Sequence, residues 1–203
     1  MAVLSMRARK KVVDYAVTSV ICCLAIVLQF TVLNRFPVHD VFCNLPLTLV
    51  IIWGAVFGSR MPPITPDELR VSSLGQIFVR QLASGSMSGA LVGALMGSLY
   101  ASILPVYPLY FAVIGWIAGY FCLRNINQQN LLCVPLVFIL TGLAESLFAL
   151  QLGLMGRPFV ADRLMLIALP EALQNALIAP FIYFPMRRWY EVSEVERTPV
   201  GAD

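Results

Sequence analysis

The fold of this chain is decided by residues 85–97, GSMSGALVGALMG, which place four glycines at intervals of four inside an apolar segment. In water, each interior glycine would destabilise a helix by roughly 1 kcal/mol relative to alanine. In a bilayer the backbone must form its own hydrogen bonds, so the segment is held helical and the glycines allow another helix to approach closely. We expect close helix packing along the row Gly85, Gly89, Gly93 and Gly97.

The composition of the 203-residue chain indicates a membrane protein. Hydrophobic residues make up 59% of it and charged residues 12%, whereas about 25% of the residues of an average soluble domain are charged. Apolar windows of about 20 residues, the length that crosses a hydrocarbon core of about 30 Å, recur six times. We therefore predict an all-α integral membrane protein with six transmembrane helices, at about 13–33, 41–59, 82–104, 106–123, 131–152 and 164–186.

Basic residues predict the orientation, since lysine and arginine are retained on the cytoplasmic side. With the N-terminus inside, eleven basic residues lie in inside segments and three, Arg35, Arg157 and Arg163, lie outside. Both termini are therefore expected to face the cytoplasm, with a polytopic membrane domain over 1–190 and a disordered cytoplasmic tail over 191–203. The net charge of +3 follows from this topology and indicates no nucleic-acid partner.

Polar side chains are few inside the predicted helices, where a buried carboxylate is costly and needs a partner. The fifth helix carries Thr141 and Glu145, and the sixth carries Glu171, Gln174 and Asn175. Counted from the outer ends of their helices at 1.5 Å per residue, both carboxylates lie roughly 10 Å below the outer surface. We expect these five residues to form one intramembrane polar cluster.

Three roles are open for this polar cluster. It can lock the fifth and sixth helices by hydrogen bonds, receive a charged residue of a partner protein, or form a substrate or proton site. The sequence shows no nucleophile with an adjacent base, no metal-ligand spacing and no phosphate-binding or cofactor loop. We therefore predict that the protein is not an enzyme, with no catalytic residue, metal or cofactor.

A second pair of glycines, Gly115 and Gly119, lies in the fourth predicted helix. The short link at residues 105–108, PVYP, requires the third and fourth helices to pack antiparallel. Two interpretations stay open: the two glycine faces pack against each other, or one of them binds a helix of another protein.

Three further stretches of the chain are LNRFP at 33–37, YFAVIGWIAGY at 110–120, and LPEALQNALIAP at 169–180 followed by RRW at 187–189. Together they resemble the MreD family of bacterial rod-shape-determining proteins. The first is similar to the first hairpin of that family, the second to its Gly-Tyr-containing helix, and the third to its C-terminal end.

This resemblance implies a non-enzymatic scaffold of the cell-elongation machinery in the bacterial cytoplasmic (inner) membrane. Such a scaffold binds MreC, a single-pass coiled-coil protein, and couples cytoplasmic MreB filaments to the glycosyltransferase and transpeptidase of peptidoglycan synthesis, directly or indirectly. Membrane lipids are also among the expected partners.

The MreD fold is also similar to the substrate-binding subunits of energy-coupling-factor transporters, so a vitamin transporter subunit is the alternative function. Those subunits dock on their coupling subunit through an Ala-x-x-x-Ala surface on the first helix. Here Ala16 is followed four residues later by Val20, so the sequence favours the scaffold.

Overall fold

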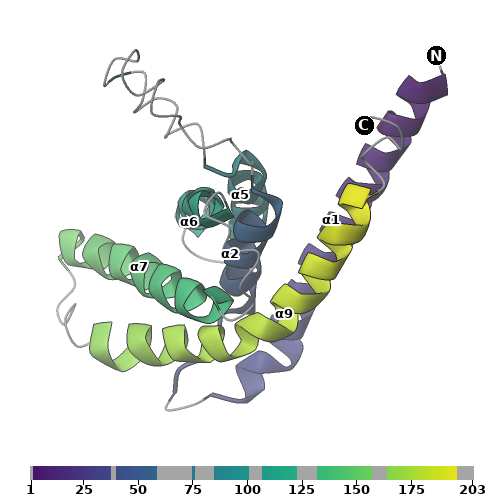
Figure 1. Cartoon of the computed structure of the whole chain (residues 1–203). Coiled ribbons are helices and arrows are strands. Elements are labelled where there is room, and N and C mark those ends of the chain that lie inside the picture. Colours follow the sequence, from purple (N-terminus) through teal and green to yellow (C-terminus); the bar gives the residue numbers. More distant parts are fainter. Residues whose placement is uncertain are drawn as a thin grey trace.

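The computed structural model describes residues 2–37, 40–58, 75, 85–100, 107–122, 132–156 and 164–195. These parts of the chain are built from helices (Figure 1). The main elements are α1 (Ala2–Thr31), α2 (Leu45–Phe57), α5 (Met87–Tyr100), α6 (Tyr107–Cys122), α7 (Cys133–Leu154) and α9 (Leu169–Val195). A 3-10 turn, η1 (Leu33–Arg35), follows α1, and a π-helical turn, η4 (Leu164–Ala168), precedes α9. The all-α prediction is confirmed.

Three of the described helical spans are long and apolar enough to cross a membrane: Ala16–Arg35, Cys133–Leu154 and Leu166–Glu191. They correspond to the first, fifth and sixth predicted spans. α2, α5 and α6 are apolar but have only 13, 14 and 16 residues. At 1.5 Å per residue even the longest of these three runs about 24 Å, which is less than a hydrocarbon core of about 30 Å. Among the residues that the structure describes, three helices therefore reach membrane length, whereas the sequence predicted six spans.

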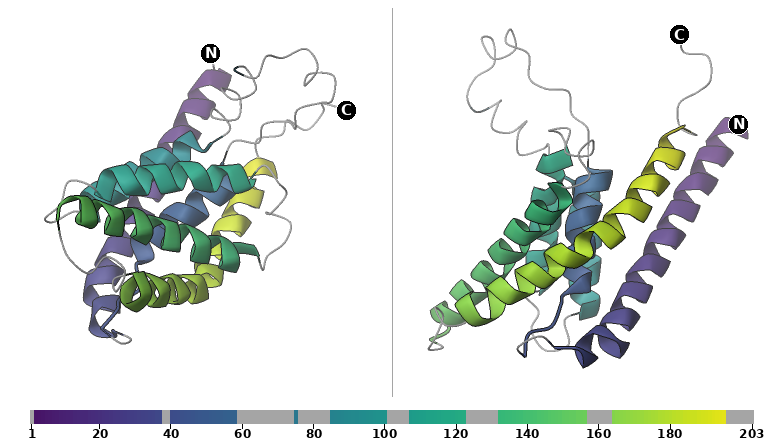
Figure 2. Two further views of the ribbon diagram at one scale, coloured as in Figure 1. Left: turned by 90° about the vertical axis from the view of Figure 1, so that its left-hand side faces the viewer. Right: turned by 60° about the horizontal axis from the view of Figure 1, so that its bottom comes forward.

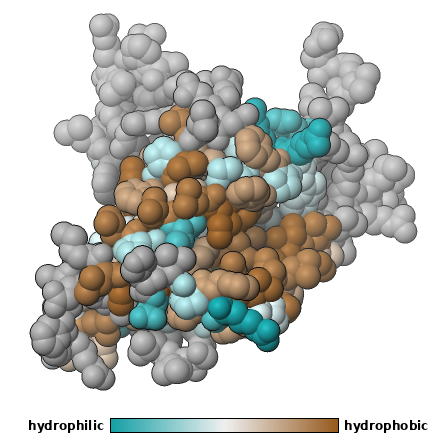
Figure 3. All heavy atoms as spheres, turned by 90° about the horizontal axis from the view of Figure 1, so that it is seen from below, coloured by the Kyte–Doolittle hydropathy of each residue, from teal (hydrophilic) through white to brown (hydrophobic). Residues whose placement is uncertain are grey.

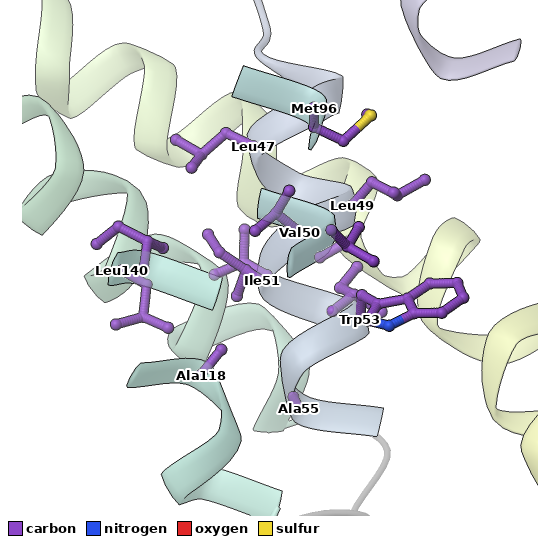
Figure 4. Packing of buried hydrophobic residues seen from close by; sticks show 14 of the residues in the cluster. Leu47, Leu49, Val50, Ile51, Trp53, Ala55, Met96, Ala118 and Leu140 are labelled. Atoms are coloured by element: carbon purple, nitrogen blue, oxygen red, sulfur yellow. The ribbon is translucent and has the colours of Figure 1, made fainter. Parts of the chain in front are cut away.

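α2 is the central helix of the bundle. Every residue from Leu45 to Val56 is buried, as expected of a helix that is hydrophobic all round. α5 and α6 cover one side of it, α7 and α9 cover another, and α1 lies against it less extensively (Figures 1 and 2). Figure 4 shows Ile51 of α2 pointing toward Leu140 of α7, while Trp53 points to the other side of α2.

α5 begins at Met87, later than the predicted start at residue 82. The hydroxyl oxygen of Ser86 accepts a hydrogen bond from the backbone N–H of Gly89 at 2.9 Å. Ser86 therefore caps the helix, because its side chain satisfies an N–H group that has no partner in the first turn. The prediction that Gly85 lies inside this helix is wrong: Gly85 precedes the cap.

α9 continues through Val195, past the predicted start of the tail at Glu191. The Nε of Arg187 donates to Glu191 at 2.8 Å, one turn along the helix, and this pair supports the last turns. Pro180 and Pro185 lie inside α9, where each removes a backbone donor and bends the helix. As a result the first half of α9 packs along α7, and its second half runs beside α1 (Figures 1 and 2).

The outward faces of the helices are strongly apolar. Leu24 of α1 is 62% exposed and Leu91 of α5 is 69% exposed. Figure 3 shows that hydrophobic residues also dominate the described part of the lower face. Apolar surface on this scale is unusual for a soluble monomer. Together with the three long apolar helices, it indicates a membrane protein.

Candidate functional site

The glycine row of α5 lies against α6, and the two backbones touch. A Cβ atom added at Gly89 would overlap the carbonyl oxygen of Gly115, and one added at Gly93 would overlap the carbonyl oxygen of Phe111. Backbone atoms cannot rotate away as a flexible side chain can. Only glycine therefore allows α5 and α6 to lie this close together.

The glycines of α6 make the same contact from the other side. A Cβ at Gly115 would overlap the carbonyl oxygen of Gly89, and one at Gly119 would overlap the backbone nitrogen of Ser86. Gly54 of α2 joins them, because its own Cβ would overlap the carbonyl oxygen of Gly115. Three helices thus meet backbone to backbone. Sequence analysis did not single out Gly54, for which the available signal was a lone glycine inside an apolar helix.

The two ends of the row are equally close. A Cβ at Gly97 would lie 2.6 Å from the carbonyl oxygen of Tyr107, and one at Gly85 would overlap the indole ring of Trp116. The backbone N–H of Ser86 also donates to the carbonyl oxygen of Trp116 at 3.1 Å. All six predicted glycines therefore lie between α5 and α6. In the described residues the two glycine faces cover each other and leave no open groove between them.

The polar cluster centres on Asn175 of α9, which is fully buried. Its side-chain oxygen accepts hydrogen bonds from the backbone N–H of Asn44 at 2.7 Å and from the thiol of Cys43 at 3.1 Å. Its amide nitrogen donates to the hydroxyl of Thr141 in α7 at 3.3 Å. One side chain thus ties α9 to α7 and to the segment that leads into α2.

Gln29 of α1 holds the same segment from the opposite side. Its amide nitrogen donates to the carbonyl oxygen of Cys43 at 2.7 Å and to the side chain of Asn34 at 2.8 Å. Its oxygen accepts from the backbone N–H of Leu45 at 2.9 Å. Sequence analysis missed Gln29 and Asn44, although an amide within an apolar helix was a signal for the former.

The segment at residues 41–44 explains why these amides gather here. It is irregular backbone that leads into α2, and its polar groups have to be satisfied within the protein because Val41, Cys43 and Asn44 are buried. Gln174 of α9 donates to the carbonyl oxygen of Val41 at 3.3 Å. The side chain of Asn44 caps α2 by accepting from the N–H of Leu47 at 3.1 Å. Side chains of α1 and α9 thus replace the backbone partners that a regular helix would supply.

The two carboxyl groups lie beside this network. Glu145 and Glu171 are buried; Glu145 lies one helical turn after Thr141 in α7, and Glu171 lies one turn before Asn175 in α9. The five predicted polar residues therefore gather at one level, and the hydrogen-bonded amides among them have a structural role. Within the described ranges, no three His, Cys, Asp or Glu side chains are arranged to hold a metal ion.

We expect Glu171→Ala to destabilise the protein, because it removes most of a buried side chain one helical turn before Asn175 and leaves a cavity there. Truncation of a buried side chain costs about 2 kcal/mol, which corresponds to a fall in melting temperature of about 4–8 °C for a chain of this size. Thermal unfolding of the detergent-solubilised protein measures it. Glu191→Ala, which removes an exposed carboxylate from α9, is the control. An unchanged melting temperature would contradict a structural role.

No protein-family model, no curated protein and no solved structure matches this chain. The resemblance to the MreD family therefore stays a prediction that depends on the three quoted stretches. The same holds for the similarity to transporter subunits.

Proposed function

We propose that this protein is a non-enzymatic membrane scaffold of the cell-elongation machinery, which holds partner transmembrane helices against a rigid core. The arrangement of the helices carries the proposal. α2, α5 and α6 meet backbone to backbone, and α2, α7 and α9 are tied by buried hydrogen bonds. In contrast, only 22% of the membrane-length span Ala16–Arg35 is buried. Most of this span is thus available to another helix.

The outward face of α1 is suited to close helix packing. Cys22, Ala25 and Gln29 of α1 are buried against the bundle. Ser19 and Cys23 are exposed and lie four residues apart on another face of the helix. Small residues at this spacing let the backbone of a second membrane helix approach closely. We infer that the single transmembrane helix of a partner binds along this face.

The resemblance to MreD supplies the identity of the partners. The helix bound to α1 belongs to an MreC-like single-pass coiled-coil protein, and through it the scaffold reaches MreB filaments and the glycosyltransferase and transpeptidase. The location that goes with this role is the bacterial inner membrane. We place α2, α5 and α6 in the membrane beside the three longer helices, which gives the six-helix arrangement of MreD. The start of α1 and the end of α9 lie on the same side of the bundle, which supports two cytoplasmic termini (Figures 1 and 2).

Affinity purification from native membranes in a mild detergent tests the proposal. The tag belongs on the C-terminal end of the chain. A single-pass protein with a periplasmic coiled coil is expected in stoichiometric amounts. Recovery of ATPase subunits together with a bound small molecule would instead assign the chain to a transporter and contradict the scaffold.

The double substitution Ser19→Leu and Cys23→Leu is expected to lower recovery of the partner about tenfold, because two leucines would keep the backbone of the partner helix away from α1; a tenfold change corresponds to about 1.4 kcal/mol. The amount of partner per tagged protein is measured by quantitative mass spectrometry. Ser146→Leu places a leucine on the exposed face of α7 and is the matched control. Equal recovery from the double variant and the control would show that α1 is not the docking helix.

A further inference from the structure

A groove of about 420 Å³ separates α1 from the second half of α9. It is lined by apolar side chains, including Val17 and Ile21 of α1, Leu49 of α2, and Ile182, Met186 and Trp189 of α9. Its volume falls in the roughly 300–1,000 Å³ range of small-ligand sites. The groove is thus large enough for an apolar molecule or part of one.

A second hollow, of about 590 Å³, carries positive charge. Its lining includes Arg187, Arg188 and Glu191, and Pro185 lines both this hollow and the apolar groove. The two hollows therefore adjoin at Pro185. Arg187 is paired with Glu191 at 2.8 Å. Arg188 forms no ion pair within the described part of the chain, so one positive charge of the hollow is not neutralised there.

We propose that the groove binds an anionic phospholipid, with an acyl chain between α1 and α9 and the phosphate at Arg188. An apolar groove that adjoins a hollow of net positive charge complements an amphiphile with an anionic head. Basic pockets between transmembrane helices on the cytoplasmic side bind such head groups. The occupant joins α1 to α9 along a length where the two helices make few direct contacts.

Aromatic residues place this end of the groove at the level of lipid head groups. Trp189 of α9 packs edge to face on Trp53 and Phe57 of α2, with ring centroids 5.9 and 5.3 Å apart. Tyr190 packs on Phe57 in the same way at 5.6 Å. Clusters of tryptophan and tyrosine are typical of the membrane–water interface. Arg188 thus lies next to the residues that mark the interface.

The dimensions of the groove favour a lipid chain over a partner helix. A helix about 10 Å across, with a pitch of 5.4 Å, fills about 420 Å³ in a single turn. A longer helix would have to separate α1 from α9. Val17 and Ile21, which line the groove, also lie on a different face of α1 from Ser19 and Cys23. Lipid and partner helix therefore bind independently.

Lipid retention by the purified full-length chain tests the proposal. The protein is incubated in mixed micelles with phosphatidylglycerol or phosphatidylcholine of identical acyl chains, and bound lipid is counted by native mass spectrometry. Phosphatidylglycerol is expected to be retained severalfold better. Arg188→Gln should reduce its retention about fivefold, the effect of one basic residue at a membrane surface. Arg35→Gln, which removes a charge beyond the other end of α1, should have no effect.

A second variant tests the groove itself. Ile182→Trp fills the apolar groove and is expected to displace both lipids while the protein keeps the elution volume of the unmodified chain. Equal retention of the two lipids, or wild-type retention of phosphatidylglycerol in Arg188→Gln, would overturn the proposal. So would loss of a partner protein from Ile182→Trp with lipid retention unchanged. Because lipid is counted on the isolated chain and partner recovery on native membranes, failure of this proposal is distinguishable from failure of the scaffold function.

Discussion

Gly89→Leu should unfold the bundle at the point where three helices meet. A Cβ at this position would overlap the carbonyl oxygen of Gly115 and lie 2.9 Å from the Cα of Gly54. α5 would therefore have to move away from both α6 and α2. Overpacking of a buried site costs typically 1–3 kcal/mol, and we expect at least the upper end here because the opposing atoms are backbone. The melting temperature in detergent should fall by about 10 °C, with most of the protein eluting as aggregate.

Gly142 of α7 provides a matched control, since no atom lies within 4 Å of a Cβ added there. Gly142→Leu should leave the melting temperature close to that of the unmodified protein. Alanine sharpens the comparison, because it favours a helix by roughly 1 kcal/mol over glycine. Gly142→Ala is thus expected to stabilise the protein or leave it unchanged, and Gly89→Ala to destabilise it. If both alanine variants raise the melting temperature, the close approach of α5 and α6 is wrong.

Asn175→Leu should have an effect of similar size through lost hydrogen bonds. The substitution keeps the volume of the side chain but leaves the N–H of Asn44, the thiol of Cys43 and the hydroxyl of Thr141 without their partner. Each buried polar group that loses its partner costs about 1–3 kcal/mol. We expect a fall in melting temperature of about 10 °C.

Maleimide labelling of Cys43 measures the local effect of Asn175→Leu. Cys43 is buried against Asn175, so a maleimide should not label it in the unmodified fold. In a variant with Cys43 as its only cysteine, Asn175→Leu should make the thiol reactive at temperatures below global unfolding. Gln174→Leu, which removes a single hydrogen bond at 3.3 Å, is the control. A larger effect from Gln174→Leu than from Asn175→Leu would contradict the central place of Asn175.

The sequence predicted the parts of the fold that depend on periodicity and composition. Apolar windows located the six main helices, and the spacing of the glycines marked the face of α5 that lies on α6. Hydropathy does not report backbone hydrogen bonds, however. It therefore did not show that Ser86 caps α5 at Met87, or that α2 has only 13 residues. The spacing of small residues identifies the packing face of a helix, but it does not show which helix covers that face.

The candidate site was predicted only in part, because sequence patterns do not report its hydrogen bonds. The polar residues of the fifth and sixth predicted helices lie at similar distances from the outer ends of those helices, which predicted that they form one cluster. Thr141 and Asn175 are indeed hydrogen-bonded to each other. The role of Gln29 depends on the irregular backbone at 41–44, which no pattern in the sequence reveals. Gly54 was missed because a single glycine forms no repeat. The roles of Gln29 and Gly54 depend on the contacts that α1 and α2 make with other parts of the chain.

Photo-crosslinking from α1 in native membranes tests the central claim most directly. A photoreactive amino acid replaces Val27, which is 56% exposed on α1 one helical turn after Cys23, and in a second strain it replaces Leu150, which is 58% exposed on α7. The account predicts a covalent adduct with a single-pass membrane protein from position 27 and none from position 150. An adduct with transporter ATPase subunits, or adducts with lipid alone at both positions, would contradict it.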